Sequence, residues 1–212
     1  MNHSNENKRE LVKKDYDAIA DLYIKHCDDN DVVLPFIDRF INSLNGKSVL
    51  DVGCGSGKIA NYFSSKGLKS KGVDFSNEMI KRARSKYPQD DFVCEDICNY
   101  QPQEQFDGIF SKYLLFHLPP EDLKNTLSNF YSMMKNDGKL CIIIDIPKVK
   151  GEQVLTEEFD ESQKIYYNYI TLDELETMLK HAQFKIDDKI IIQNNDISAE
   201  YAYGVVVVYA SK

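Results

Sequence analysis

The sequence of 212 residues has no tryptophan and no long apolar run. No apolar stretch approaches the roughly 18 residues that a membrane-spanning helix needs. Residues 1–7 are polar and include no apolar signal region. We therefore expect no membrane partner and predict a cytoplasmic location.

Positive charge is also scarce, since the formal net charge is −8 and the isoelectric point is near 5.1. A protein that binds nucleic acid needs a basic surface against the phosphate backbone, so nucleic acid is not an expected partner. Two local basic clusters are expected to be solvated helix faces. They are formed by Lys8, Arg9, Lys13 and Lys14, and by Lys81, Arg82, Arg84 and Lys86.

The cysteines form no recognisable framework, because they are five in number and irregularly spaced. They are Cys27, Cys54, Cys94, Cys98 and Cys141. An odd, irregular set favours neither a disulfide scaffold nor a zinc site. We expect reduced thiols and no metal.

The central feature of the sequence lies at residues 48–60, where a short apolar run leads into three alternate glycines. Residues 48–52 read as a strand, and Gly53, Gly55 and Gly57 then open a helical pattern. Glycine lets the main chain approach a ligand without a Cβ in the way, and a helix N-terminus then faces that ligand. The pattern predicts a strand, a cofactor-binding loop and a helix.

The glycine spacing separates two families of cofactor. The dinucleotide fingerprint Gly-x-Gly-x-x-Gly would need glycine at position 58, which holds Lys58. This weakens the interpretation as an NAD-dependent oxidoreductase, which stays an alternative because it shares the strand, the glycine turn and an acidic ribose ligand.

The spacing Asp51-x-Gly53-x-Gly55-x-Gly57 instead resembles motif I of the class I S-adenosylmethionine-dependent methyltransferases. The resemblance implies that the turn, with Cys54 in it, passes beneath the methionine and ribose parts of S-adenosylmethionine. It also implies that Asp51 helps to hold the methionine part, and that S-adenosylhomocysteine is the product.

The remaining elements predict an α/β fold. Helical patterns cover 11–27 and 32–44, after a loose polar tail at 1–10, and Asn136-Asp137-Gly138 is expected to end a helix that opens at Pro119-Pro120. Strands are expected at 71–75, 91–94, 106–110, 140–146, 184–192 and 201–209, the last two joined by the polar segment 193–200. Ser76 and Thr171 are expected to cap helices.

Strands that alternate with helices indicate a doubly wound, Rossmann-like sheet in a single domain. The resemblance adds a mostly parallel order with one antiparallel strand near the C-terminus. The expected parts are a helical cap (1–45), a cofactor-binding core (46–146), a lid or inserted helix (147–170) and a C-terminal helix with a hairpin (171–212).

Polar residues follow the predicted strands, where ligands bind in open α/β sheets. Asp74 closes the second strand, and its carboxylate suits two ribose hydroxyls. Phe75 could flank the adenine or belong to the core. The resemblance assigns Asp96 to the adenine amino group and the backbone of Ile97 to the ring, although Asp96 also reads as an ordinary loop carboxylate.

The stretch Ser111-Lys112-Tyr113 lies in a region that resembles motif IV of the family, beside the cofactor. It lacks the Asn/Asp-Pro-Pro-Tyr signature of members that methylate nucleic-acid amines or protein amides. It also lacks the acid cluster of metal-dependent, catechol-type members. A small-molecule acceptor and a metal-independent, in-line transfer are therefore the leading interpretation.

The remaining candidate site residues would cover the cofactor or accept a proton. Tyr16 and Tyr23 resemble an N-terminal element that folds over the cofactor, although an amphipathic helix explains the same spacing. His117, Tyr113 and Asp145 are the candidate bases, and His117 also suits a structural role. A protein that binds the cofactor without catalysis is the other alternative.

Overall fold

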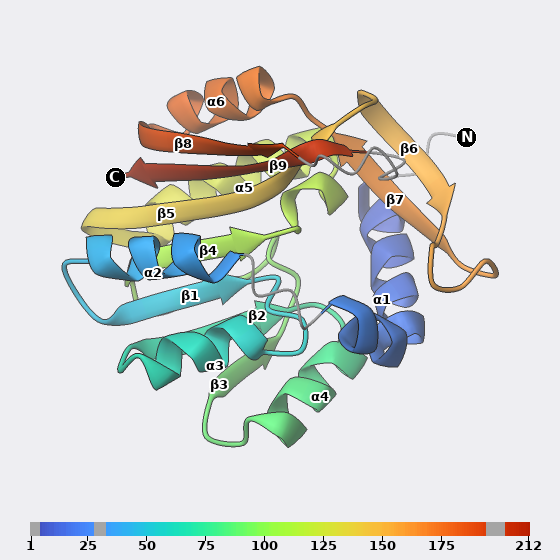
Figure 1. Ribbon diagram of the computed structural model, residues 1–212, viewed down its shortest axis with the longest axis horizontal. Coiled ribbons are helices and arrows are strands. Elements are labelled where there is room, and N and C mark those ends of the chain that lie inside the picture. The colour runs from blue at the N-terminus through green and yellow to red at the C-terminus, as the bar shows by residue number, and fades with distance from the viewer. Residues whose placement is uncertain (1–4, 28–32, 194–201) are drawn as a thin grey trace.

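The computed structural model describes residues 5–27, 33–193 and 202–212, and within them one large sheet forms the centre of the molecule (Figure 1). Its strands are β1 (Ser48–Val52), β2 (Lys69–Asp74), β3 (Asp91–Cys94), β4 (Phe106–Lys112), β5 (Met134–Pro147), β8 (Lys185–Gln193) and β9 (Ala202–Ser211). The seven strands follow the order β3-β2-β1-β4-β5-β9-β8.

The pairing of these strands confirms the predicted sheet. β1 pairs in parallel with β2 and β4, β2 with β3, and β4 with β5. β9 lies between β5 and β8 and is antiparallel to both. Parallel strands that are buried on both faces need apolar side chains throughout, which explains the continuous apolar run of β5. The connection 193–200 lies, from residue 194 on, outside the described residues.

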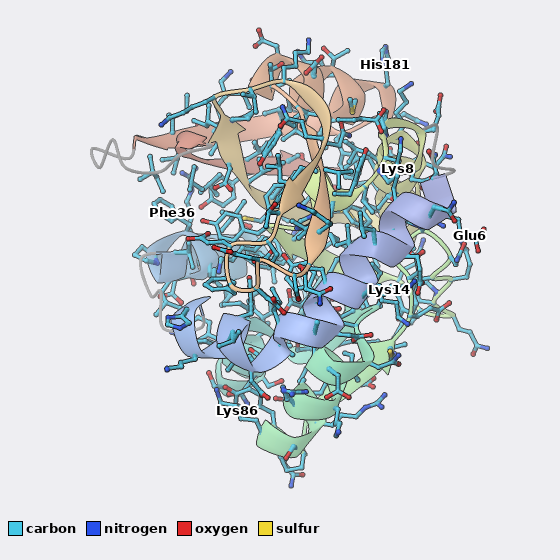
Figure 2. All side chains as sticks on the ribbon, turned by 90° about the vertical axis from the view of Figure 1, so that its right-hand side faces the viewer. Glu6, Lys8, Lys14, Phe36, Lys86 and His181 are labelled. Carbon is cyan, nitrogen blue, oxygen red and sulfur yellow. The ribbon has the colours of Figure 1, made fainter. Side chains whose placement is uncertain are left out.

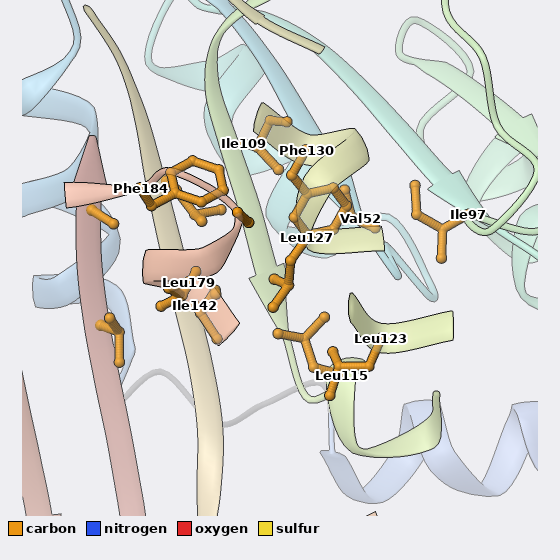
Figure 3. Packing of buried hydrophobic residues seen from close by; sticks show 14 of the residues in the cluster. Val52, Ile97, Ile109, Leu115, Leu123, Leu127, Phe130, Ile142, Leu179 and Phe184 are labelled. Atoms are coloured by element: carbon orange, nitrogen blue, oxygen red, sulfur yellow. The ribbon is translucent and has the colours of Figure 1, made fainter. Parts of the chain in front are cut away.

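Helices cover both faces of the sheet, as a doubly wound fold requires. On one face, α2 (Leu34–Ser43) and α3 (Lys58–Ser65) bury Phe40 and Phe63 against Phe110 of β4. On the other, α5 (Pro120–Met133) and α6 (Leu172–His181) bury Leu127 and Leu179 in the cluster of Figure 3. α4 (Asn77–Lys86) packs beside β3 and a short 3₁₀ helix, η2 (Leu115–His117), follows β4.

The predicted helix caps at Ser76 and Thr171 are both confirmed. The side chain of Ser76 accepts a hydrogen bond from the backbone N–H of Met79, and Thr171 forms a capping box with Glu174. The predicted stop at residues 136–138 is wrong, because α5 ends at Met133 and β5 already begins at Met134. Pairing with β4 extends β5 to Met134, because Met134 lies opposite Phe106, where β4 begins.

The N-terminal helix α1 (Asn5–Cys27) begins earlier than the sequence indicated. The expected loose tail is wrong for residues 5–10, which are helical, and residues 1–4 lie outside the described residues. Lys8 pairs with Glu152, and the Arg9 guanidinium pairs with acids of the core, so tertiary contacts stabilise this turn.

Residues 147–170 form a β-hairpin, so the alternative of an inserted helix is wrong. β6 (Gly151–Thr156) and β7 (Lys164–Tyr169) pair antiparallel in a separate two-stranded sheet. The run Lys-Ile-Tyr-Tyr-Asn-Tyr in β7 favours a strand because aromatic and β-branched residues suit a pleated surface. β7 packs on α1, and Figure 2 shows the hairpin and α1 side by side. A lid function of this hairpin stays a prediction.

Within the described residues, no helix is long and apolar enough to cross a lipid bilayer.

Candidate active site

The glycine turn after β1 lies against the end of β2, where the backbone N–H groups of Gly53 and Cys54 both donate to the Val73 carbonyl at 2.8 and 3.1 Å. Gly55 has φ of 49° and lines the first pocket, and a Cβ added there would meet nothing within 4 Å. Gly57 is different: its φ is 79° and an added Cβ would lie 2.5 Å from Cζ of Phe92. Gly55 therefore leaves room for a ligand, and Gly57 lets α3 pack against β3.

Two adjoining pockets open at this edge of the sheet. The first has about 420 Å³ of empty space, open solvent included, and is lined by Val12, Tyr16, Tyr23, Gly53, Gly55, Asp74, Phe75, Met79, Lys112, Tyr113, Leu114 and His117. The second has about 360 Å³, again with open solvent included, and is lined by Arg9, Gly53, Val73, Asp74, Phe75, Glu95, Asp96, Ile97, Leu114, His117 and Leu118. Asp74 and Phe75 belong to both, so the two pockets form one elongated site.

Asp51 is buried at the end of β1, and its Oδ2 has no hydrogen-bond partner among the residues that the structure describes. Burial, followed by repulsion from Asp74, raises the pKa of Asp51 to about 7, while Lys112 and the backbone N–H of Ala60 oppose the rise. A buried carboxylate oxygen without a donor is costly unless a ligand supplies one. The site therefore has an acceptor available for a cationic group such as an ammonium.

Asp74 is held in a fixed orientation at the end of β2. Its Oδ2 accepts from the backbone N–H of Gly55 and its Oδ1 from that of Ser76, each at 2.9 Å. Burial raises the pKa of Asp74 to about 6, and these two hydrogen bonds oppose that rise. Each carboxylate oxygen keeps a lone pair, so Asp74 can accept two more hydrogen bonds from a bound ligand.

Asp96 lines the second pocket and is positioned by groups from two elements. Its Oδ1 accepts from the backbone N–H of Cys98 at 2.9 Å, and its Oδ2 accepts from Nε of Arg9 at 2.8 Å. Arg9 also pairs with Asp122, and its side chain is only 15% exposed. The expectation that Arg9 belongs to a solvated face is therefore wrong.

Tyr16, Tyr23 and His117 meet at the first pocket. His117 is buried, with Nδ1 3.0 Å from the Tyr166 carbonyl and Nε2 3.0 Å from the Tyr16 hydroxyl. Burial lowers the pKa of His117 to about 4, so the ring is neutral at pH 7. A carbonyl only accepts, so Nδ1 carries the proton and Nε2 accepts from Tyr16.

Most of the residues that the sequence selected are brought together here. The first pocket collects Tyr16, Tyr23, Gly53, Gly55, Asp74, Phe75, Lys112, Tyr113 and His117, and the second adds Asp96 and Ile97. Asp51 acts on this group through its charge interactions with Asp74 and Lys112.

Five selected residues line neither of these two pockets: Asp51, Cys54, Gly57, Ser111 and Asp145. Cys54 packs in the core with Ile80 and Ala83, and Ser111 is buried with no hydrogen-bond partner for its hydroxyl among the described residues. Asp145 is partly buried at the end of β5, where burial raises its pKa to about 6 against the opposing charge of Lys112.

Several lining residues were not selected from the sequence, among them Arg9, Val12, Met79 and Leu114. Val12 and Met79 carry the helical apolar pattern that predicts core, and nothing local distinguishes them as ligand contacts. Within the described residues, no group of three or more His, Cys, Asp or Glu side chains could hold a metal ion.

The sequence of this chain is similar to those of known methyltransferases. A family model described as "Methyltransferase domain" matches residues 49–138. The chain is 37% identical over 116 residues to a putative methyltransferase, 235L, of Invertebrate iridescent virus 6, and this match covers 52% of the chain and 42% of the viral protein. It is 28% identical over 169 residues to a ubiquinone biosynthesis O-methyltransferase of Chromobacterium violaceum, covering 72% and 70% of the two chains.

Among solved structures, the fold is similar to that of 1,6-didemethyltoxoflavin-N1-methyltransferase from Burkholderia thailandensis. The TM-score is 0.77 at 18% identity, over 99% of this chain and 91% of that one. The matched domain contains the glycine turn, Asp74 and Asp96, and the similar fold extends over the helices and the hairpin around it. Residues 49–138 therefore match a methyltransferase domain, and the chain as a whole has a fold similar to that of a solved methyltransferase.

Proposed function

We propose that this protein transfers a methyl group from S-adenosylmethionine to a small-molecule acceptor by in-line displacement, without a metal. The observation that supports this most directly is that two carboxyl groups, those of Asp51 and Asp74, lie at one site and can each accept hydrogen bonds from a ligand. Within the described residues, Asp51 has a buried oxygen without a donor. Two backbone N–H groups fix Asp74, whose carboxylate oxygens keep lone pairs for a ligand. Gly55, which lines the first pocket with Asp74, leaves open space where a side chain would stand.

The residues fit the cofactor part by part. Asp51 would accept from the amino group of the methionine part, and Lys112, which lines the first pocket, would face its carboxylate. Asp74 would accept from the ribose hydroxyls. Asp96 and Ile97, in the second pocket, would contact the adenine.

Bound S-adenosylmethionine would supply an electrophilic methyl group on a sulfonium, so the chain needs chiefly to orient the acceptor and to accept its proton. The Tyr16 hydroxyl donates a hydrogen bond to Nε2 of His117. The lone pairs of the Tyr16 oxygen are therefore available to accept from an N–H or O–H of the methyl acceptor. With its pKa lowered to about 4, His117 is a weak terminal base. The pair therefore orients the acceptor more than it removes the proton.

A small acceptor also suits the way the site is covered. Arg9, Val12, Tyr16 and Tyr23 come from α1 and line the two pockets, so this helix closes the edge at which ligands would enter. A net charge of −8 disfavours a nucleic acid acceptor. A cytoplasmic location stays a prediction.

Calorimetric titration with S-adenosylmethionine, S-adenosylhomocysteine and NAD tests the proposal. We expect both adenosyl ligands to bind and NAD not to bind. Asp74→Ala should weaken S-adenosylhomocysteine binding by roughly 1.5–3 kcal/mol through the loss of charge-assisted hydrogen bonds. The exposed Asp173 on α6 provides the matched control, Asp173→Ala, which should leave binding unchanged.

Binding of NAD alone would overturn the proposal in favour of an oxidoreductase. Binding of both adenosyl ligands, with no methylated product from a panel of amines, phenols, thiols and carboxylates, would favour a protein that binds the cofactor without catalysis.

A further inference from the structure

Asp17 of α1 caps the start of α4, a helix that lies beside α1 (Figure 1). Its Oδ1 accepts a hydrogen bond from the Ser76 hydroxyl at 2.6 Å and another from the backbone N–H of Glu78 at 3.1 Å. The Ser76 hydroxyl in turn accepts from the backbone N–H of Met79. The first N–H groups of a helix have no partner within it, so a carboxylate placed there satisfies one of them. Two residues that are distant in the sequence therefore cap α4 together.

Ser76 connects this cap to the candidate cofactor site. It is fully buried, and its backbone N–H donates to Oδ1 of Asp74 at 2.9 Å. The Ser76 hydroxyl has a single proton, which it donates to Asp17, so hydrogen bonds fix both the side chain and the main chain of this residue. Asp17, Ser76 and Asp74 thus form one chain of hydrogen bonds, which runs from α1 to the acid that would accept from the ribose hydroxyls.

A second contact between α1 and α4 bypasses Ser76. The Arg82 guanidinium donates to both carboxylate oxygens of Asp21, at 2.6 and 2.8 Å. Arg82 lies in the body of α4, beyond its first turn. The side chain of Asp21 is 82% exposed, so this ion pair contributes little to stability. Asp21 therefore offers a matched control for Asp17 on the same pair of helices.

The charge of Asp17 also acts on Asp74. The pKa of Asp74 is raised to about 6 by burial, which the hydrogen bonds from Ser76 and Gly55 oppose and the charge of Asp17 reinforces. An ionised carboxylate accepts hydrogen bonds more strongly than a protonated one. Ribose binding should therefore weaken as the pH falls through this value, and the loss should occur at a lower pH once the charge of Asp17 is removed.

Other titratable groups face Asp74 from each neighbouring element. Asp51 of β1, Cys54 in the glycine turn and Cys94 of β3 interact with its charge. The linings of the two pockets add Arg9, Tyr16 and Tyr23 from α1, Glu95 and Asp96 after β3, and Lys112, Tyr113 and His117 at and after the end of β4. All of these groups are retained when Asp17 is replaced by Asn. A changed pH dependence in that variant would therefore report the charge of Asp17.

We propose that Asp17 is a positioning residue of the cofactor site, which orients the Asp74 carboxylate through Ser76 and couples the docking of α1 to ribose binding. This inference rests on the proposed function and adds to it a residue that lines neither pocket. Tyr16, the residue before Asp17, lines the first pocket, so the same anchor also places the part of α1 that covers the ligand. Docking of α1 and binding of the ribose should favour one another, because coupling between two sites is reciprocal.

Calorimetric titration of the full chain with S-adenosylhomocysteine, between pH 5 and pH 8, tests the proposal. Asp17→Ala should weaken binding roughly five- to tenfold at pH 8, because Ser76 loses its charged acceptor. Asp17→Asn keeps an acceptor oxygen and should restore most of this loss. It should also retain binding to a lower pH than the native protein does. Asp21→Ala and Asp21→Asn should match the native protein in both affinity and pH dependence.

A double variant tests the route through Ser76. The losses of affinity in Asp17→Ala and Ser76→Ala should not add when the two changes are combined, since both break the same chain of hydrogen bonds. Additive losses would mean that Asp17 acts by another route, and would overturn the proposal. Circular dichroism of each variant checks that it is folded, and Asp17→Asn carries the pH test if Asp17→Ala does not fold.

The two proposals fail in different ways. If the native protein does not bind S-adenosylhomocysteine, the proposed function fails, and the role of Asp17 fails with it. If the native protein binds and Asp17→Ala binds equally well, only the role of Asp17 is wrong. An equal loss in Asp21→Ala, or a native pH dependence in Asp17→Asn, would show that Asp17 only joins α1 to α4.

Discussion

Asparagine in place of Asp51 should stabilise the protein at alkaline pH while removing a cofactor contact. Asp51 has its pKa raised from 3.8 to about 7, so the folded chain holds a proton that the unfolded chain releases. An acid whose folded pKa is raised loses stability as the pH rises from its unfolded value to its folded value. Asn keeps the shape of Asp and can still accept from the N–H of Ala60.

The magnitude follows from the two pKa values of Asp51. Between pH 5 and pH 8, the cost of ionising the buried carboxyl grows by about 2–3 kcal/mol, given the values 3.8 and about 7. The stability gap between Asp51→Asn and the native protein should grow by that amount over the same range. Comparing the gap at two pH values cancels any effect of the amide that does not depend on pH.

Urea unfolding of both proteins at pH 5 and pH 8, without cofactor, measures the gap. Asp107 provides the control: hydrogen bonds from Ser48 and Lys135 lower its pKa to about 2 despite burial, so Asp107→Asn should show no growing gap between pH 5 and pH 8. A gap for Asp51→Asn that stays constant with pH would refute the reasoning. The same variant should bind S-adenosylhomocysteine more weakly, because stability and binding make opposite demands on Asp51.

Three further outcomes are expected. Arg9→Met should weaken S-adenosylhomocysteine binding by roughly 1–2 kcal/mol in calorimetry, because Asp96 loses the charged donor that orients it, whereas Lys14→Met on the same helix should not. Tyr16→Phe should lower kcat and leave the KM for S-adenosylmethionine nearly unchanged. A rise in KM as large as the fall in kcat would contradict an orienting role. Gly57→Ala should cost about 1–3 kcal/mol in urea unfolding, since its φ is 79° and the new Cβ would lie 2.5 Å from Phe92, and a native midpoint would contradict the packing argument.

The sequence by itself determined the features whose signals are local. The apolar run of β1, the glycines after it and the cap at Ser76 each act within a few residues, and the structure has all three where the pattern indicated. Asp74 was found for the same reason: ligands bind at the carboxyl ends of parallel strands, and the end of that strand can be read directly.

Tertiary structure alone decided the features that join distant segments. The first turn of α1 is polar and reads as a tail, yet it is helical because Arg9 pairs with Asp96, 87 residues away. The hairpin at 147–170 was not distinguished from a helix, because its sequence has no clear periodicity and the strand-favouring residues of β7 are fixed in place by packing on α1.

The protonation of the site depends on tertiary structure in the same way. The Tyr166 carbonyl fixes the tautomer of His117, and burial, followed by repulsion from Glu157, raises the pKa of Asp15 to about 8. A sequence shows which residues can titrate, but burial and neighbours set their pKa values, and both arise only when the chain has folded.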